Sequence, residues 1–418
     1  MTKHLPPDSS PQSTEPVPPA QLNGSQAALA ALAQAIATGD LAAARQEYER
    51  AVAILEALGD RAGMAAACCE MGRLAHSVGE IAEARQLYQH SMTIAEELED
   101  RPATAIVLHN LGNLACLTGD YAEAHRLYQR SMTIAQDLGD RAGIASTLHQ
   151  LGMLALNAGD VAKARRLYQQ SLDIEEELGN RAGIARSLHE LGSLASLAGD
   201  IAEAHRLYRR SMTIAEEFED RTNVANTLGE LGNLAAEAGD VAEAQRLYRR
   251  SMTIAQEVGD RSVVAIALHQ MGNLAFLAGD RAEAHRLYRQ SLGIAEELGD
   301  RPGIASTLGQ LALLAGAEGD LAKAERLYRQ NLALCRELGD VVTGRVTLSN
   351  LALLCESQGR LAEAASLLER AVEIGERVEL PDLAQDRYFL ERVRLQMRPG
   401  CMGWAMRRAV ALSHALKH

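Results

Sequence analysis

A forty-residue unit that repeats along the chain without insertion or deletion constrains the fold more than any other feature of this sequence. Residues 101–140 read RPATAIVLHNLGNLACLTGDYAEAHRLYQRSMTIAQDLGD, and residues 141–180 read RAGIASTLHQLGMLALNAGDVAKARRLYQQSLDIEEELGN. Repetition at a fixed period of this size is typical of architectures in which each unit packs only on its neighbours. Further copies begin at residues 61, 181, 221, 261 and 301, a weaker copy begins at 341, and a degenerate copy fills 21–60.

Each unit carries two helical patterns. Apolar residues recur at spacings of three and four in both halves of the unit, which indicates two amphipathic helices of about 18 residues. Between the halves, Gly119 is expected to end the first helix in a left-handed conformation, and Asp120 to cap the second. Glu123 follows three residues after this cap, which predicts a capping box. The unit is therefore predicted to be a helical hairpin.

A glycine in the middle of the first helix needs a packing reason, because glycine is a poor helix former. Gly112 is followed twelve residues later by Ala124 and sixteen residues later by Tyr128. We expect the small pair to let the two helices approach closely and the tyrosine ring to fill space against the neighbouring unit. The glycine recurs as Gly72, Gly152, Gly192, Gly232 and Gly272.

The residues Leu111-Gly112, Ala124, Tyr128 and Ser131 match the signature positions of the tetratricopeptide repeat, and the sequence resembles that family over residues 21–380. The forty-residue unit resembles the long repeats of kinesin light chain, of Pins-type adaptors and of bacterial tetratricopeptide signalling proteins. The resemblance implies an all-α fold, a right-handed α-solenoid (superhelix) of about nine helical hairpins.

The two ends of the chain depart from the repeat. Residues 1–20 hold six of the ten prolines and are expected to be a disordered leader, after which Ser25 is predicted to cap the first helix. Residues 381–418 are predicted to form a capping helix, over 382–397, and a basic tail. The tail is partly amphipathic over 401–418, so either contact with a membrane or partner, or simple folding back, remains open.

Composition narrows the class of protein. The net charge is −13 although residues 381–418 are basic, so the acidity lies in the repeats and argues against nucleic-acid binding. Six cysteines are scattered without a C-x-x-C pair, and no apolar run approaches membrane-spanning length. We therefore expect a reduced, cytoplasmic protein without a membrane anchor; its oligomeric state stays open.

Catalytic and metal-binding motifs are missing from the sequence. It has no phosphate-binding loop and no G-x-S-x-G, and His189-Glu190 begins an H-E-x-x-H in which Ser193 replaces the second histidine. Histidines recur three residues before the central glycine, as His109, His149, His189 and His269. They should lie on the first helices of successive hairpins, too far apart to share one metal ion. We expect no enzyme activity, cofactor or metal, and interpret the histidines as a polar ladder or as an inherited consensus.

In tetratricopeptide proteins the first helix of each hairpin lines the inner groove, and the resemblance transfers this role to four positions around each central glycine. Asn113, Asn233 and Asn273 are expected to be the main polar contacts, because nothing within the helix requires asparagine there; neutral, solvated asparagines are the alternative. The predicted peptide-binding groove consists of His109, Asn113, His149, Arg186, His189, Asn226, Asn233, His269, Asn273 and Phe276.

The second helices carry a stripe of arginines. The stripe could bind phosphates or an acidic partner, but a solvated face paired with Glu203 and Glu243 is favoured. The members are Arg206, Arg209, Arg210, Arg246, Arg249, Arg250, Arg286, Arg289, Arg326 and Arg329.

The sequence thus predicts a non-enzymatic scaffold or adaptor that binds a partner peptide or helix in its concave groove. The alternative is a sensor or regulatory subunit of a bacterial signalling system, with an ATPase or transcription factor supplied by another chain.

Overall fold

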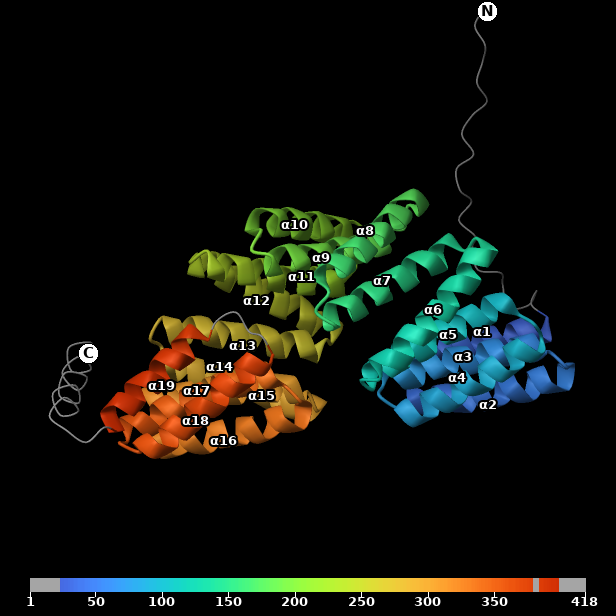
Figure 1. The fold of residues 1–418 in the computed structure, drawn as a ribbon. Helices are drawn as coiled ribbons and strands as arrows, with labels where there is room; N and C mark the ends of the chain where they lie inside the picture. The colour runs from blue at the N-terminus through green and yellow to red at the C-terminus, as the bar shows by residue number, and fades with distance from the viewer. Residues whose placement is uncertain (1–22, 379–382, 398–418) are drawn as a thin grey trace, which may run out of the picture. The chain divides into compact units, whose positions relative to one another are not determined.

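The computed structural model describes residues 23–378 and 383–397, and every regular element in these ranges is an α-helix (Figure 1). In each hairpin we call the first helix A and the second helix B. The helices are α1 (Gly24–Ala37), α2 (Leu41–Leu58), α3 (Arg61–Ser77), α4 (Ile81–Glu97), α5 (Arg101–Leu117), α6 (Tyr121–Leu138), α7 (Arg141–Asn157), α8 (Val161–Leu178), α9 (Arg181–Leu197), α10 (Ile201–Glu217), α11 (Arg221–Glu237), α12 (Val241–Val258), α13 (Arg261–Leu277), α14 (Arg281–Leu298), α15 (Arg301–Ala317), α16 (Leu321–Leu338), α17 (Val341–Ser357), α18 (Leu361–Arg377) and α19 (Ala384–Met397).

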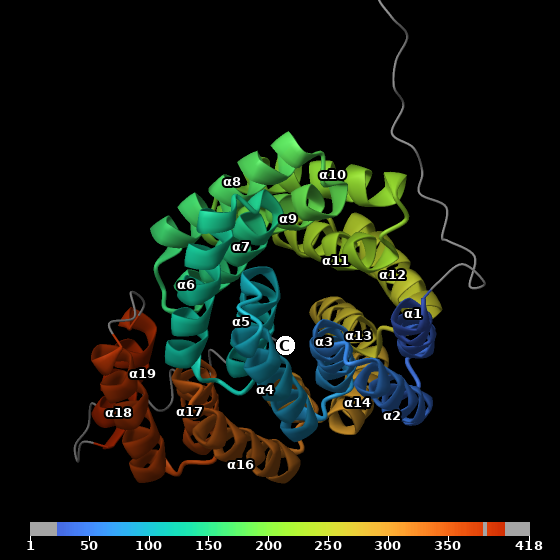
Figure 2. The ribbon, with the colours of Figure 1, turned by 90° about the vertical axis from the view of Figure 1, so that its right-hand side faces the viewer.

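The chain divides into two compact units, of which the first ends at Leu194 and the second begins at Ala195. In the first unit each A helix packs on its own B helix, as α5 does on α6, and on the A helix of the next hairpin, as α5 does on α7. The second unit repeats this pattern with α11, α12 and α13. The hairpins can be followed in chain order in Figures 1 and 2. The predicted all-α solenoid of helical hairpins is thus confirmed within each unit.

The hairpin turns form as the Gly-Asp pairs predict, with two corrections to the predicted caps. Gly119 has a φ of 79°, and the Asp120 carboxylate accepts a hydrogen bond from the Glu123 backbone N–H at 3.0 Å. The Glu123 side chain, however, receives hydrogen bonds from Arg126 one turn along the helix, at 2.8 and 2.7 Å, so the predicted capping box is wrong. At α1 the cap is Asn23 rather than Ser25, and there Gln26 completes a capping box.

The tyrosine of each hairpin accounts for its glycine, which corrects the expected packing. A Cβ atom on Gly112 would lie 2.5 Å from Cε1 of Tyr128, and one on Gly272 would lie 2.7 Å from the ring of Tyr288. The ring therefore packs on the A helix of its own hairpin, where the absence of a side chain on glycine leaves room for it. The same contact recurs at Gly72, Gly152 and Gly232.

Polar contacts hold each hairpin at its centre and at its open end. The buried Ser131 hydroxyl donates to the Ala105 carbonyl at 2.9 Å, and Ser251 makes the same bond to Ala225 at 2.7 Å. At the open end, Arg101 forms a salt bridge with Asp137 at 2.5 Å, between the start of α5 and the end of α6. Both contacts recur along the chain because the repeat keeps the same register.

The predicted capping helix is confirmed as α19, which packs on α18. Its Asp386 is buried, forms an ion pair with Arg345 of α17, and accepts a hydrogen bond from Ser349 at 2.7 Å. Gln396 of α19 donates to Glu356 at 2.7 Å. The predicted leader (1–20) and tail (401–418) lie outside the described residues, so the domain bounds stay a prediction.

Candidate functional site

The predicted groove residues all lie on A helices, and their spacing of three, four or seven residues brings those of one helix to the same face. Arg186 and Asn226 are exposed, whereas the others are partly buried. In the first unit they are His109 and Asn113 on α5, His149 on α7, and Arg186 and His189 on α9. In the second unit they are Asn226 and Asn233 on α11, and His269, Asn273 and Phe276 on α13.

The asparagines have a structural task that sequence reasoning missed. The hydroxyl of Tyr128 donates a hydrogen bond to Oδ1 of Asn113 at 2.7 Å, and Tyr248 donates to Asn233 at 2.8 Å. Tyr288 and Asn273 repeat this bond at 2.8 Å. These tyrosines are at most 2% exposed, so each hydroxyl needs an acceptor inside the hairpin. These amides therefore serve the hairpin, although nothing within their own helix requires them.

Repeats without the asparagine support this interpretation. Arg73 and Met153 occupy the position in the hairpins of Tyr88 and Tyr168. Both of these hydroxyls are buried without a hydrogen-bond partner among the described residues. Burial raises the pKa of Tyr168, and the nearby Glu190 carboxylate raises it further. The amide thus compensates a buried hydroxyl in some repeats and not in others.

In the second unit the asparagines belong to a network that links successive hairpins. The Gln270 side chain of α13 donates to Asn233 of α11 at 3.1 Å and accepts from the amide nitrogen of Asn273 at 2.8 Å. The amide nitrogen of Asn233 donates to Glu230 at 3.2 Å. Each asparagine oxygen therefore accepts from a tyrosine, while the amide nitrogen of Asn113 has no hydrogen-bond partner among the described residues.

The bridging position, two residues before the central glycine, was missed by the sequence analysis. A signal was present, because this position is polar and able to accept a hydrogen bond in every repeat from residue 61 onward. Its residues are Glu70, Asn110, Gln150, Glu190, Glu230, Gln270, Gln310 and Asn350.

The histidines lie in the seams between hairpins. The ring of His109 packs 5.5 Å from that of Tyr128 and also approaches Thr147 of the next A helix, at 3.5 Å from Oγ1. Burial and, to a smaller extent, the positive charge of Arg186 together lower the pKa of His109 and of His149 to about 4. Both rings are therefore neutral at physiological pH. Among the described residues, no three His, Cys, Asp or Glu side chains lie close enough to hold a metal ion.

A small pocket of about 150 Å³ opens on the A-helix face of the first unit, between α5 and α7. Its polar lining includes His109, Asn110, Ser146 and Thr147, and Ile106 forms part of its apolar side. Hydroxyl, amide and neutral imidazole groups can each donate a hydrogen bond to a polar ligand. The pocket is thus suited to a small side chain rather than to a large cofactor.

Other features of the described residues add no further chemistry. No described helix is long and apolar enough to cross a membrane. Burial raises the pKa of the Cys68 thiol and raises that of Cys69 to about 11. These thiols therefore remain protonated and have little nucleophilic character.

Comparisons with known proteins agree with this architecture. A Rap protein complexed with competence and sporulation factor has a TM-score of 0.61 and 13% identity, over 85% of this chain and 98% of that one. The apo quorum sensor NprR from B. thuringiensis has a TM-score of 0.61 and 13% identity, over 83% and 97%. Aspartyl phosphate phosphatase F from Bacillus subtilis has a TM-score of 0.56 and 10% identity, over 84% and 94%. At such identities the likeness concerns the fold alone.

No curated protein sequence matches the chain. A family model described as tetratricopeptide repeat matches residues 63–137, 143–217, 223–297 and 303–377, which together make up more than half of the sequence. Each segment spans two hairpins, and the first three segments carry the glycine, tyrosine and serine contacts described above. The chain therefore belongs to the tetratricopeptide repeat family.

Proposed function

We propose that this chain is a non-enzymatic interaction scaffold that binds a segment of a partner protein along the A-helix face. The observation that supports this most directly is the row of partly exposed amides whose orientation is fixed by buried tyrosines. A side chain held in this way loses little conformational entropy on binding, so its remaining hydrogen bonds favour the complex. The family membership agrees with such a role.

The first unit has more polar groups available to a partner than the second unit, where the asparagine nitrogens are already hydrogen-bonded. The Asn113 oxygen is occupied by Tyr128, so the amide nitrogen is the group left to donate to a partner carbonyl. Arg186 is exposed and supplies a positive charge on the same type of helix. We therefore propose an extended partner segment whose backbone carbonyl meets Asn113 and which carries an acidic group near Arg186.

A role as the sensor or regulatory subunit of a signalling system is the second candidate. Two similar structures favour it, since one is a Rap protein complexed with competence and sporulation factor and the other is described as a quorum sensor. A third is described as a phosphatase, but fold likeness at 10% identity gives no reason to transfer its activity.

Site-specific photocrosslinking in the native host tests the proposed face. A photoreactive amino acid would replace Ile106 or Asn226, which are exposed on A helices, and Thr93 or Thr133, which are exposed on B helices of the first unit, as controls. We expect a discrete partner adduct from the A-helix positions only. Adducts from the B-helix positions alone would refute the assignment.

The captured partner is then purified and its affinity is measured against two variants. Asn113→Asp keeps an oxygen to accept from Tyr128 but removes the amide donor, so it should weaken binding without loosening the hairpin. Arg186→Gln should weaken binding by removing the charge. Full affinity in both variants would contradict the proposed contacts, even if the crosslinks confirm the face.

A further inference from the structure

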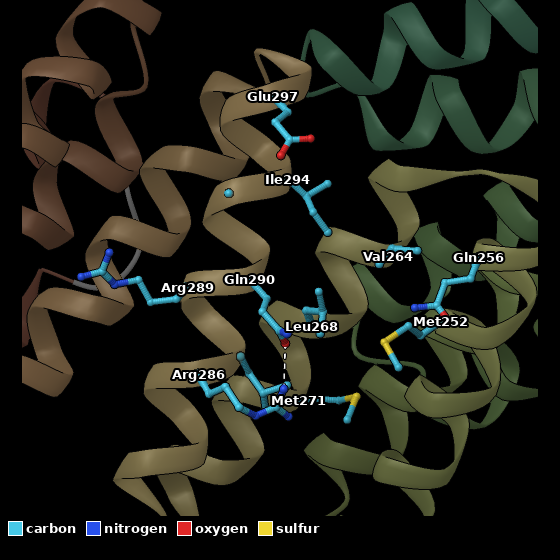
Figure 3. A pocket seen from close by; sticks show the side chains of 12 residues that line it. Met252, Gln256, Val264, Leu268, Met271, Arg286, Arg289, Gln290, Ile294 and Glu297 are labelled. Carbon is cyan, nitrogen blue, oxygen red and sulfur yellow. Dashed lines mark hydrogen bonds between the residues drawn. The ribbon is translucent and has the colours of Figure 1, made fainter.

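Three hollows open at the same repeat position on the side of the hairpins opposite to the tyrosine-bound amides. Each lies between two successive B helices, over the A helix that connects them. In the first unit, the hollow between α6 and α8 has a volume of about 670 Å³. In the second unit, the hollow between α10 and α12 measures about 750 Å³, and that between α12 and α14 about 490 Å³. The last of these is shown in Figure 3.

The apolar floors of the hollows are nearly the same in both units. Each floor combines two large residues of the A helix with a methionine of the preceding B helix. Such a surface accepts varied aliphatic side chains, because methionine is flexible and polarizable. The three sets are Leu148, Leu151 and Met132; Leu228, Leu231 and Met212; and Leu268, Met271 and Met252.

The walls differ in charge between the units. In the first unit the polar lining consists of Gln129, Thr133, Gln136, Gln170 and Asp173, without an arginine. In the second unit five arginines line the two hollows, against the acids Asp240, Glu243 and Glu297. We call these five the arginine rim: Arg209, Arg246, Arg250, Arg286 and Arg289.

Three of the five rim arginines form exposed salt bridges, and Arg289 forms none with a described residue. Figure 3 shows Arg289 extending away from the apolar centre of its hollow. Arg286 pairs with Glu283 at 2.5 Å and donates to Gln290 at 2.9 Å. Arg246 and Arg250 pair with Glu243 and Glu216, but exposed pairs of this kind are weak and exchange readily.

We propose that these two hollows of the second unit, here called the outer groove, bind an amphipathic helix of a partner protein that carries acidic residues. Its apolar side chains would enter the hollows, and its Asp or Glu residues would meet the arginine rim. This surface is separate from the A-helix face and does not depend on the function proposed for that face. The chain would thus hold two partners at once.

The shape and chemistry of the groove select a helix. The flanking α12 has 18 residues, so a partner helix lying along it would contact the groove over about 27 Å. Charge complementarity selects acidic residues, because five arginines line the outer groove. The equivalent hollow of the first unit has a similar apolar floor but no arginine. Single-stranded RNA is disfavoured, since the hollows expose no aromatic ring on which bases could stack.

The test uses the full chain and three labelled synthetic 18-residue helices, followed by fluorescence anisotropy. All three share one leucine stripe, and their flanking residues are Glu, Gln or Lys. We expect the Glu peptide to bind most tightly and to weaken as the salt concentration rises. The double variant Arg209→Gln/Arg250→Gln should weaken it about tenfold.

Arg126→Gln is the matched control, because Arg126 makes the same pair with Glu123 in the first unit as Arg246 makes with Glu243 in the second. The Arg126→Gln variant should bind the Glu peptide with unchanged affinity. The variant Arg209→Lys/Arg250→Lys should keep most of the affinity that Arg209→Gln/Arg250→Gln loses. Equal binding of the Glu and Gln peptides would overturn the proposal. So would an equal loss in the Arg126→Gln variant, or displacement of the Glu peptide by a single-stranded RNA oligonucleotide.

Discussion

The bond between Tyr248 and Asn233 gives the sharpest test of how the hairpins are held together. Tyr248 is 2% exposed, and its hydroxyl donates to Asn233 at 2.8 Å. Asn233→Ala leaves this buried hydroxyl without an acceptor and also removes the acceptor of Gln270. We expect a cost of about 1–3 kcal/mol in the free energy of unfolding of this hairpin.

The chain contains its own control for this effect. Tyr88 is fully buried, but its hydroxyl has no hydrogen-bond partner among the described residues. Tyr88→Phe should therefore be neutral or slightly stabilising, whereas Tyr248→Phe should cost about 0.5–1.5 kcal/mol. In the double variant Asn233→Ala/Tyr248→Phe, the loss of unfolding free energy should be about 1 kcal/mol smaller than the sum of the losses in the two single variants.

Native-state hydrogen exchange is the suitable assay, because repeat proteins open locally and a single unfolding transition can mislead. Protection should fall in α11 and α12 for Asn233→Ala and stay unchanged in α3 and α4 for Tyr88→Phe. Additive losses in the double variant, or equal losses for the two Tyr→Phe variants, would refute the assigned role of the amide.

Three further predictions concern packing, pH and the C-terminal cap. Gly112→Ala should lower the melting temperature because its Cβ would lie 2.5 Å from a tyrosine ring, whereas Gly293→Ala, with no atom within 4 Å, should raise it; the same sign for both would contradict the packing. Because the pKa of His109 is lowered to about 4, the unfolded chain binds the extra proton first, so stability should be lost as the pH falls from about 6.5 to 4; a melting temperature independent of pH in this window would exclude it. Asp386→Asn should cost about 3 kcal/mol by leaving Arg345 without its buried partner, and exchange in α19 that stays slow would argue against this.

Local chemistry explains why so much of the fold could be predicted. The forty-residue period, the Gly-Asp turns and the apolar spacing of three and four each depend on residues that are close in sequence. Gly119 takes its left-handed φ and Asp120 caps its helix whatever the rest of the chain does. The arginine–glutamate pairs of the B helices follow equally from spacing on one helix, as at Arg206 and Glu203.

Contacts across the hairpin could not be predicted in the same way. Sequence reasoning assigned Asn113 to an outside partner, but the structure commits its oxygen to Tyr128, fifteen residues away. It also missed Gln270, which bridges to the asparagine of the preceding repeat. Both bonds depend on how far one helix is rotated about its axis relative to its neighbour, which periodicity leaves undetermined.

The sequence by itself therefore determined the helices, their turns and their stacking order, because these follow from backbone preferences and the spacing of apolar residues. Only the tertiary structure decided which polar groups compensate buried hydroxyls and which remain for a partner. That division depends on burial, since the same asparagine is a free donor on a surface and a required acceptor beside a buried tyrosine. Asn113 combines both roles, because its oxygen accepts from Tyr128 while its amide nitrogen remains a donor for a partner.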